Sequence, residues 1–271
     1  MNRYKLIRFG VWAAAFMSAA TLFIIIFYIL VNGVPHLTPD LFSWRYTSEN
    51  VSMTPAIINT AVMTVLSLLV SVPLGLFTAI YLVEYSRASR FLTFIRLAVQ
   101  TLAGIPSIVY GLFGLIFFVT FLSWGFSILS GALTLAIMVL PVIIRTGEEA
   151  LIAVPVSYRE GSFALGATRL RTVFRVVIPA AVPGIMAGII LAIGRIAGET
   201  AALIYTAGTV AKTITGVTSS GRTLAVHMYV LSSEGFNTDQ AAATAVVLLV
   251  LVAGMNALSL YIAKKAVSYE Q

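Results

Sequence analysis

The stretch Ala180–Ala207, AAVPGIMAGIILAIGRIAGETAALIYTA, decides the fold class of this chain. A helix needs about 20 predominantly apolar residues to cross a bilayer, and this run is longer than that. It contains only two charged residues, Arg195 and Glu199. The stretch is therefore expected to form a membrane-spanning helix with an ionisable pair inside it.

The rest of the chain has the same character. Hydrophobic residues make up 59% and charged residues 10% of its 271 residues, with a mean hydropathy of +0.99; soluble domains contain about 25% charged residues. Apolar runs predict an all-α integral membrane protein whose residues 1–271 form a single transmembrane domain with six spans: Val11–Val31, Ile57–Val83, Leu97–Leu122, Phe126–Ile144, Ala180–Ala207 and Ala241–Ala263. Only Ser123–Gly125 separates the third and fourth spans, which predicts a tight helical hairpin. The apolar part of the first span exceeds the roughly 7–15 residues of a signal peptide, so it is expected to remain uncleaved.

The distribution of basic residues predicts the orientation, because cytoplasmic loops of membrane proteins are enriched in Lys and Arg. With the amino terminus inside, thirteen basic residues are cytoplasmic: Arg3, Lys5, Arg8, Arg87, Arg90, Arg96, Arg145, Arg159, Arg169, Arg171, Arg175, Lys264 and Lys265. Three are external, namely Arg45, Lys212 and Arg222. Both termini are therefore expected in the cytoplasm.

Arg195 and Glu199 are expected to matter, since a charge near the bilayer centre costs about 2.5–3.5 kcal/mol on insertion scales. At positions i and i+4 the two side chains can share one helix face. Two interpretations are open: a structural pair that neutralises itself, or a polar lining on a substrate path. An Arg guanidinium binds oxyanions well, and a neighbouring carboxylate would limit its affinity.

The third span contains GIPSIVYG at residues 104–111. Pro106 removes one backbone donor and is expected to kink this helix. Ser107 and Tyr110 are candidates either to satisfy the freed backbone groups or to line a pathway.

Two external loops are predicted, His36–Pro55 and Thr209–Gln240, and the second is expected to contain a short helix near Leu224–Leu231. Its basic residues could attract an anion, but a solvated loop is an equal alternative. A metal or catalytic role is not expected for His227, because no cluster of ligands accompanies it.

The residue pattern of the predicted cytoplasmic loop Arg145–Pro179 predicts two short helices along the membrane surface. Pro155 suits the first turn of one helix, and Gly166 suits a left-handed residue at its end. In the second helix, Leu170, Val173, Phe174 and Val177 recur at helical spacing. Such a pair would either rest on lipid headgroups or dock a protein.

The segment from Glu160 to Pro179 resembles the signature loop of ATP-binding-cassette (ABC) importer permeases, whose pattern is E-A-A, three residues, G, nine residues, I, any residue, L-P. Glu160, Gly166 and Pro179 fit with the same spacing. Gly161 and Ser162 replace the two Ala, and Val176 and Ile178 replace the Ile and Leu. Together with GRIAGET (residues 194–200) and GIPSIVYG, this loop makes the chain similar to the phosphate-specific permeases of this family, of the Pst A-subunit type, from about Ile57 to Ala263.

The resemblance implies the type I importer arrangement, with a cytoplasmic coupling-helix loop at 145–179 and a core at about 57–263. It implies that Glu160, Gly166, Ile178 and Pro179 contact an ATPase subunit, and that Arg195, Glu199, Ser107 and Tyr110 line the substrate path. It also implies a second homologous permease, two ATP-binding subunits that use ATP and Mg, a phosphate-binding protein outside, and a bacterial or archaeal inner membrane. The chain itself is expected to bind no cofactor, metal or nucleic acid.

Other functions are weaker interpretations. The chain has no G-x-x-x-x-G-K-[ST] phosphate loop, so it is not expected to be the ATPase. A permease for sulfate or molybdate is the nearest alternative, and an ion-driven secondary transporter would not need the signature loop. A membrane-embedded enzyme is disfavoured, because no nucleophile–base set or metal cluster is present in the sequence.

The orientation can be tested directly, because the chain contains no cysteine. Single cysteines at Ser157 and at Thr215, in cells treated with a membrane-impermeant maleimide, should label at Thr215 only. Labelling of Ser157→Cys from outside intact cells would overturn the predicted topology.

Overall fold

The computed structural model describes residues 3–86, 89–235 and 237–268, and these contain helices and loops but no strand. Arg87, one of the predicted cytoplasmic residues, lies outside them, as do the terminal residues 1–2 and 269–271. The α-helices are α1 Arg3–Gly33, α2 Thr54–Ile80, α3 Arg90–Ala103, α4 Ser107–Gly114, α5 Ile128–Ile152, α6 Val156–Ala164, α7 Arg169–Thr172, α8 Ile178–Ala197, α9 Ala201–Ile204, α10 Leu224–Glu234 and α11 Thr238–Ser268. Short 3₁₀ turns cover Val34–His36 and Pro39–Phe42, and π-helical segments cover Tyr81–Tyr85, Leu115–Phe121 and Val173–Val177.

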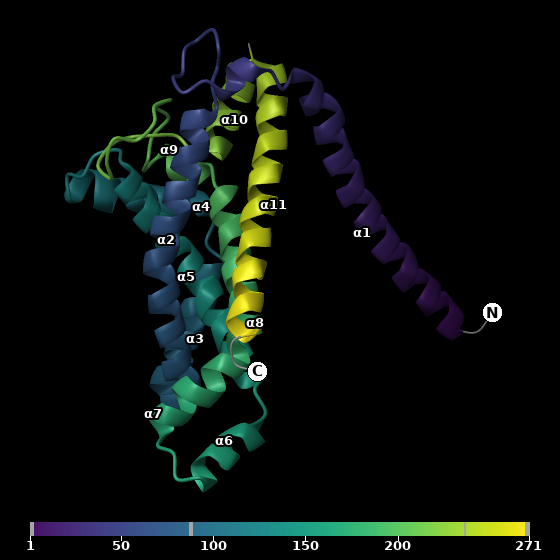
Figure 1. The fold of residues 1–271 in the computed structure, drawn as a ribbon, viewed down its shortest axis with the longest axis vertical. Coiled ribbons are helices and arrows are strands. Elements are labelled where there is room, and N and C mark those ends of the chain that lie inside the picture. Colours follow the sequence, from purple (N-terminus) through teal and green to yellow (C-terminus); the bar gives the residue numbers. More distant parts are fainter. Residues whose placement is uncertain (1–2, 87–88, 236, 269–271) are drawn as a thin grey trace.

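Five helices are long and apolar enough to cross a membrane, and a bent pair supplies a sixth span if it counts as one. This confirms the predicted all-α membrane fold. The five are built on α1, α2, α5, α8 and α11, while α3 and α4 form the bent pair. Figure 1 shows α6 and α7 at one end of the bundle and α10 at the other, here called the α6 end and the α10 end.

The third span was wrongly predicted as one kinked helix. Its two parts, Arg90–Ala103 and Ser107–Phe121, are bent by 99° relative to one another. Pro106 lacks an N–H and adopts an extended conformation with ψ of 141°, so the helix ends at Ala103 and begins again at Ser107. An ion pair of 2.5 Å between Arg96 and Glu148 joins α3 to α5.

The fifth span also differs from the prediction, because α8 ends at Ala197 and residues 198–200 are not helical. Gly198 caps α8, and a separate short helix, α9, follows from Ala201. The opposite end of α8 is longer than predicted, since α7 and the π-helical segment run into it without a break and the whole span covers Arg169–Ala197.

The bundle core forms where α2, α5 and α8 pack together. Its largest cluster includes Met63, Leu135, Met138 and Ile196, each at most 2% exposed. Polar contacts also link the helices: the Ser67 hydroxyl in α2 donates to the Ala132 carbonyl of α5 at 3.0 Å. This packing provides a rigid frame for the interrupted segments.

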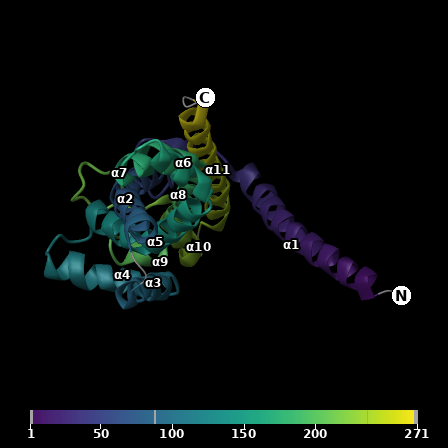
Figure 2. The ribbon, with the colours of Figure 1, turned by 90° about the horizontal axis from the view of Figure 1, so that it is seen from below.

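Helix α1 stands apart from this bundle, as Figures 1 and 2 show. No residue in its most apolar window is buried, and Phe16, Phe23 and Tyr28 are all more than two-thirds exposed. A span that presents apolar side chains on all sides requires lipid or another membrane protein around it.

The Thr209–Gln240 loop contains the expected short helix, α10. The alternative of a solvated loop does not hold for two of its residues, since Arg222 is 4% and His227 is 1% exposed. Asn59 of α2 holds this segment against the bundle: its amide donates to the carbonyls of Lys212 and Arg222 at 3.0 and 3.1 Å, so the loop is fixed to α2 at these two residues.

Candidate functional site

The two interrupted spans meet in the membrane domain. The third span is interrupted at residues 104–106 and the fifth at residues 198–200, here called the breaks. Helices α4 and α9, which begin directly after them, contact one another. A Cβ atom on Gly111 would lie 2.7 Å from the Ala202 Cα, so the two backbones touch. The chain therefore places two sets of non-helical backbone groups near each other inside apolar sequence.

Glu199 stabilises its break by capping a helix rather than by pairing with Arg195. Its Oε1 accepts a hydrogen bond from the Ala202 N–H at 3.1 Å, at the first turn of α9. No ion pair joins Arg195 to Glu199 in the part of the chain that the structure describes. The predicted i, i+4 pair on one helix face is therefore wrong, because α8 ends between the two residues.

Arg195 lies in the last turn of α8 and is partly buried. Its position at a helix C-terminus is electrostatically favourable, because the carbonyl ends there carry partial negative charge. No acidic partner within the described residues neutralises it, so its positive charge remains available to another anion. Among the four predicted path residues, Arg195 is the one whose chemistry suits binding of an oxyanion.

Tyr110 provides a hydrogen-bond donor for a backbone carbonyl at the break in the third span. Its hydroxyl donates to the Leu102 carbonyl at 2.7 Å, and that carbonyl belongs to the last turn of α3. This fulfils the first of the two predicted roles for Tyr110. Ser107 is the first residue of α4 and is partly buried at the same break.

The Arg145–Pro179 loop forms a second candidate site at the α6 end. Pro155 is the N-cap of α6, and Gly166 follows the helix with φ of +80°, the left-handed conformation expected for it. The Ser162 and Thr172 hydroxyls lie 2.8 Å apart and form a hydrogen bond between α6 and α7. Ser162 stands where the family pattern has Ala, which could not make this bond. Glu160 is exposed on α6, and Ile178 and Pro179 are partly buried at the start of α8.

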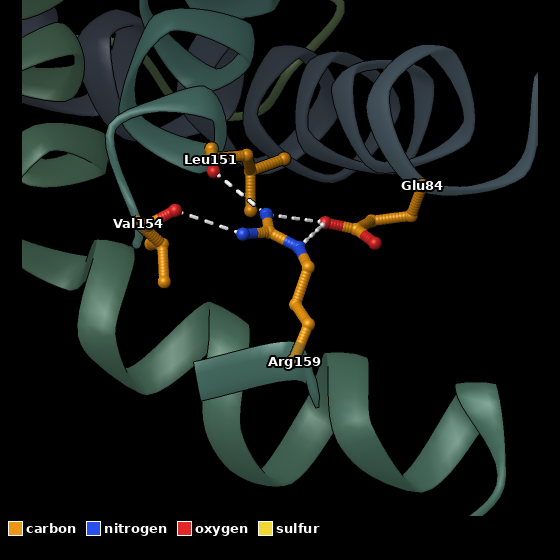
Figure 3. A network of polar contacts seen from close by, with 4 residues as sticks. All are labelled: Glu84, Leu151, Val154 and Arg159. Carbon is orange, nitrogen blue, oxygen red and sulfur yellow. Dashed lines mark hydrogen bonds and ion pairs between the residues drawn. The ribbon is translucent and has the colours of Figure 1, made fainter. Parts of the chain in front are cut away.

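Arg159 holds this loop against the bundle, and sequence reasoning missed that role. Its Nε and Nη2 donate to Oε1 of Glu84 at 3.0 and 2.6 Å, while Nη2 and Nη1 also reach the carbonyls of Leu151 and Val154 (Figure 3). Glu84, at the end of the second span, is 6% exposed. One guanidinium thus connects α6 to the ends of two spans. The sequence feature that could have indicated this contact is Glu84, a single acidic residue at the end of an apolar run.

Helix α6 has no buried residue and carries large apolar side chains that are exposed beside the exposed polar residues Ser157 and Glu160. Val156, Tyr158 and Phe163 are 65%, 53% and 46% exposed, and Leu165, at the turn, is 90% exposed. Beside this turn, Ser162, Gly166, Arg171 and Arg175 line a groove of about 280 Å³. A helix that exposes several large apolar side chains is suited to docking another protein.

The sequence of residues 71–267 matches the family described as "Binding-protein-dependent transport system inner membrane component". The match covers most of the chain and includes both candidate sites. The chain belongs to this family. It is a multi-pass permease subunit of an ABC importer and not the ATPase.

Curated relatives agree with this assignment. The permease is 34% identical over 246 residues to "Probable ABC transporter permease protein YqgI" of Bacillus subtilis, covering 85% of this chain and 83% of that one. It is 44% identical over 155 residues to "Phosphate transport system permease protein PstA 1" of Mycobacterium tuberculosis, covering 56% of this chain and 50% of the relative. The matched region thus spans about half the length of that mycobacterial protein.

The fold matches a solved ABC importer as well. A bacterial transporter involved in the import of the acidic polysaccharide alginate aligns with a TM-score of 0.65 and 14% identity, over 97% of this chain and 98% of that chain. This likeness confirms the importer permease fold.

Gly166 provides a test of the loop geometry. A β-branched residue with positive φ costs about 1–2 kcal/mol, whereas open space surrounds the Gly166 Cα, so no steric clash is added. Gly166→Val should insert into membranes normally but co-purify with less ATPase, and Gly166→Asn should retain more, because Asn tolerates this conformation.

Gly161→Val is the matched control, since Gly161 lies on α6 in open space without positive φ. Equal ATPase recovery from Gly166→Val and Gly161→Val would show that the left-handed turn does not position the loop.

Proposed function

We propose that the permease carries inorganic phosphate across the cytoplasmic membrane, forming the translocation path together with a second, homologous permease. The observation that carries this proposal is Arg195, a cation without an acidic partner among the described residues, placed where two interrupted helices meet. Interrupted helices at such sites let a protein present polar groups inside a membrane. The names of its PstA relatives support phosphate as the anion.

The α6 end is proposed to face the cytoplasm, with both termini on that side. There α6 and the turn at Gly166 would dock one of two ATP-binding subunits, which supply energy from ATP and Mg. The exposed apolar side chains on α6 support a protein partner, because a solvated helix would carry polar ones. On the opposite side, the α10 end would receive phosphate from an extracytoplasmic binding protein.

Helix α1 supports the proposed second permease. Its exposed apolar surface lies beside a hollow of about 760 Å³ lined by residues of α1, α10 and α11, including Tyr28, Met228 and Ala242. A spanning helix of the partner, together with lipid, would cover such a surface.

Sulfate or molybdate remains the alternative substrate class, because a guanidinium recognises each of these oxyanions through the same hydrogen bonds. The relatives include permeases whose names specify no substrate. Competition between these anions and phosphate in uptake experiments separates the two possibilities.

Arg195 gives the direct test. Arg195→Gln should reduce phosphate uptake by about tenfold or more, the factor associated with one charge-assisted hydrogen bond, while the complex still assembles. Glu199→Gln keeps an acceptor for the Ala202 N–H and should therefore assemble normally. Uptake of radiolabelled phosphate and co-purification of all subunits are measured for each variant.

The double variant Arg195→Gln/Glu199→Gln decides between a path residue and a structural charge. Because no ion pair joins the two residues, the double variant should assemble and remain as inactive as Arg195→Gln. Near-normal uptake by the double variant would mean that Arg195 serves only to balance Glu199.

A further inference from the structure

A second arginine, Arg222, is buried at the α10 end without an acidic partner among the residues that the structure describes. It is 4% exposed, and its Nε and Nη2 have no hydrogen-bond partner within the described part of the chain. A buried charge requires compensation, because removing an ion from water costs several kcal/mol. The unpartnered atoms therefore identify a position where an anion would be stabilised.

The geometry of Arg159 shows what these two atoms can bind. Nε and Nη2 lie on the same edge of a guanidinium, and in Arg159 this edge holds the Glu84 carboxylate at 3.0 and 2.6 Å. In Arg222 the same edge is buried and unoccupied by any acceptor of the described chain. The two arginines differ in that Arg159 has a carboxylate from its own chain, whereas Arg222 has none among the described residues.

Two aromatic side chains, Tyr46 and His227, lie close to Arg222. The Tyr46 ring covers the guanidinium, with its centroid 4.8 Å from the Arg222 Cζ, and it also contacts the His227 ring edge to face at 6.2 Å. His227 is 1% exposed, and its ring nitrogens have no side-chain hydrogen-bond partner among the described residues, where the Val51 backbone is the hydrogen-bonding group that acts on the ring. Burial, together with the charge of Arg222, lowers the pKa of His227 to about 3, so the neutral ring can donate one hydrogen bond near physiological pH.

The backbone around Arg222 is firmly held, which favours a built site over an accidental arrangement. The Asn59 amide donates to the Arg222 carbonyl at 3.1 Å, and the Thr60 hydroxyl accepts from the Leu224 N–H at 2.8 Å. Both anchoring residues are at most 1% exposed in α2, a helix of the bundle core. The position of Arg222 is thus fixed before any ligand arrives.

We propose that Arg222, with His227 and the lid formed by Tyr46, is a binding site for a small inorganic oxyanion at the α10 end of the permease. This inference rests on the proposed function and extends it: the site receives the anion before it reaches Arg195. Helix α10, which begins just after Arg222, contacts α9, and Glu199 caps the first turn of α9. The two arginines would therefore hold the same anion in succession at neighbouring positions.

Equilibrium dialysis with radiolabelled inorganic phosphate tests the site in the assembled complex, purified in phospholipid-free detergent without the binding protein. Arg195→Gln serves as the background, so that the inner arginine does not contribute. This complex should still bind phosphate, and adding Arg222→Gln should weaken binding by at least about tenfold, as expected for a lost charge-assisted hydrogen bond. Arg45→Gln in the same background is the matched control, because Arg45 is an exposed arginine of the loop that contains Tyr46; it should leave binding unchanged.

Arg222→Lys keeps the experiment decisive if Arg222→Gln fails to assemble, because lysine retains the charge but lacks the two-donor edge. It should also weaken binding. Absence of phosphate and sulfate binding in the Arg195→Gln complex, or equal affinities with Arg222 and with its assembled variants, would overturn the site. Arg222-dependent binding of sulfate without phosphate would support the site and contradict the proposed substrate.

Discussion

The structure depends on one constraint: inside a bilayer, a chain must satisfy its own backbone hydrogen bonds. Two spans of the permease are interrupted, and side chains at or next to each interruption form hydrogen bonds with the backbone groups that are freed there. Tyr110 donates to the Leu102 carbonyl, and Glu199 accepts from the Ala202 N–H. Because Glu199 serves the backbone, it does not neutralise Arg195. Arg195 is thus left without an acidic partner among the described residues, as a consequence of how the breaks are stabilised.

A second consequence concerns how movement at the α6 end can reach these breaks. Arg159 connects α6 to the ends of the second span and of α5. Helix α5 packs against α8, which carries Arg195 in its last turn and ends at the second break. Rigid helices joined by a buried ion pair transmit displacement better than flexible loops, since breaking such a pair costs about 3–5 kcal/mol. The loop proposed to dock the ATPase is therefore mechanically continuous with the site proposed to handle the anion.

The features that could be predicted from the sequence are those that depend on a local pattern of residues. Apolar length predicted the spans, and glycine's tolerance of positive φ predicted the turn at Gly166. The sequence-based predictions failed where backbone breaks or tertiary contacts determine the local structure. Helical spacing suggested that Arg195 and Glu199 would pair, but Gly198 ends the helix between them, and Pro106 bends its span by 99° rather than merely kinking it. The roles of Glu84 and Asn59 depend on partners about 75 and 153–163 residues away in sequence, and no local pattern encodes such distances.

The central claim is that this permease passes phosphate inward using energy from a separate ATPase. The most direct measurement is ATP hydrolysis and phosphate accumulation in proteoliposomes that contain the complete assembly, with the binding protein added on the side of the α10 end. Phosphate-loaded binding protein should raise hydrolysis, and phosphate should accumulate only when ATP is present. Hydrolysis that responds to sulfate or molybdate but not to phosphate, or phosphate accumulation without ATP, would contradict the claim.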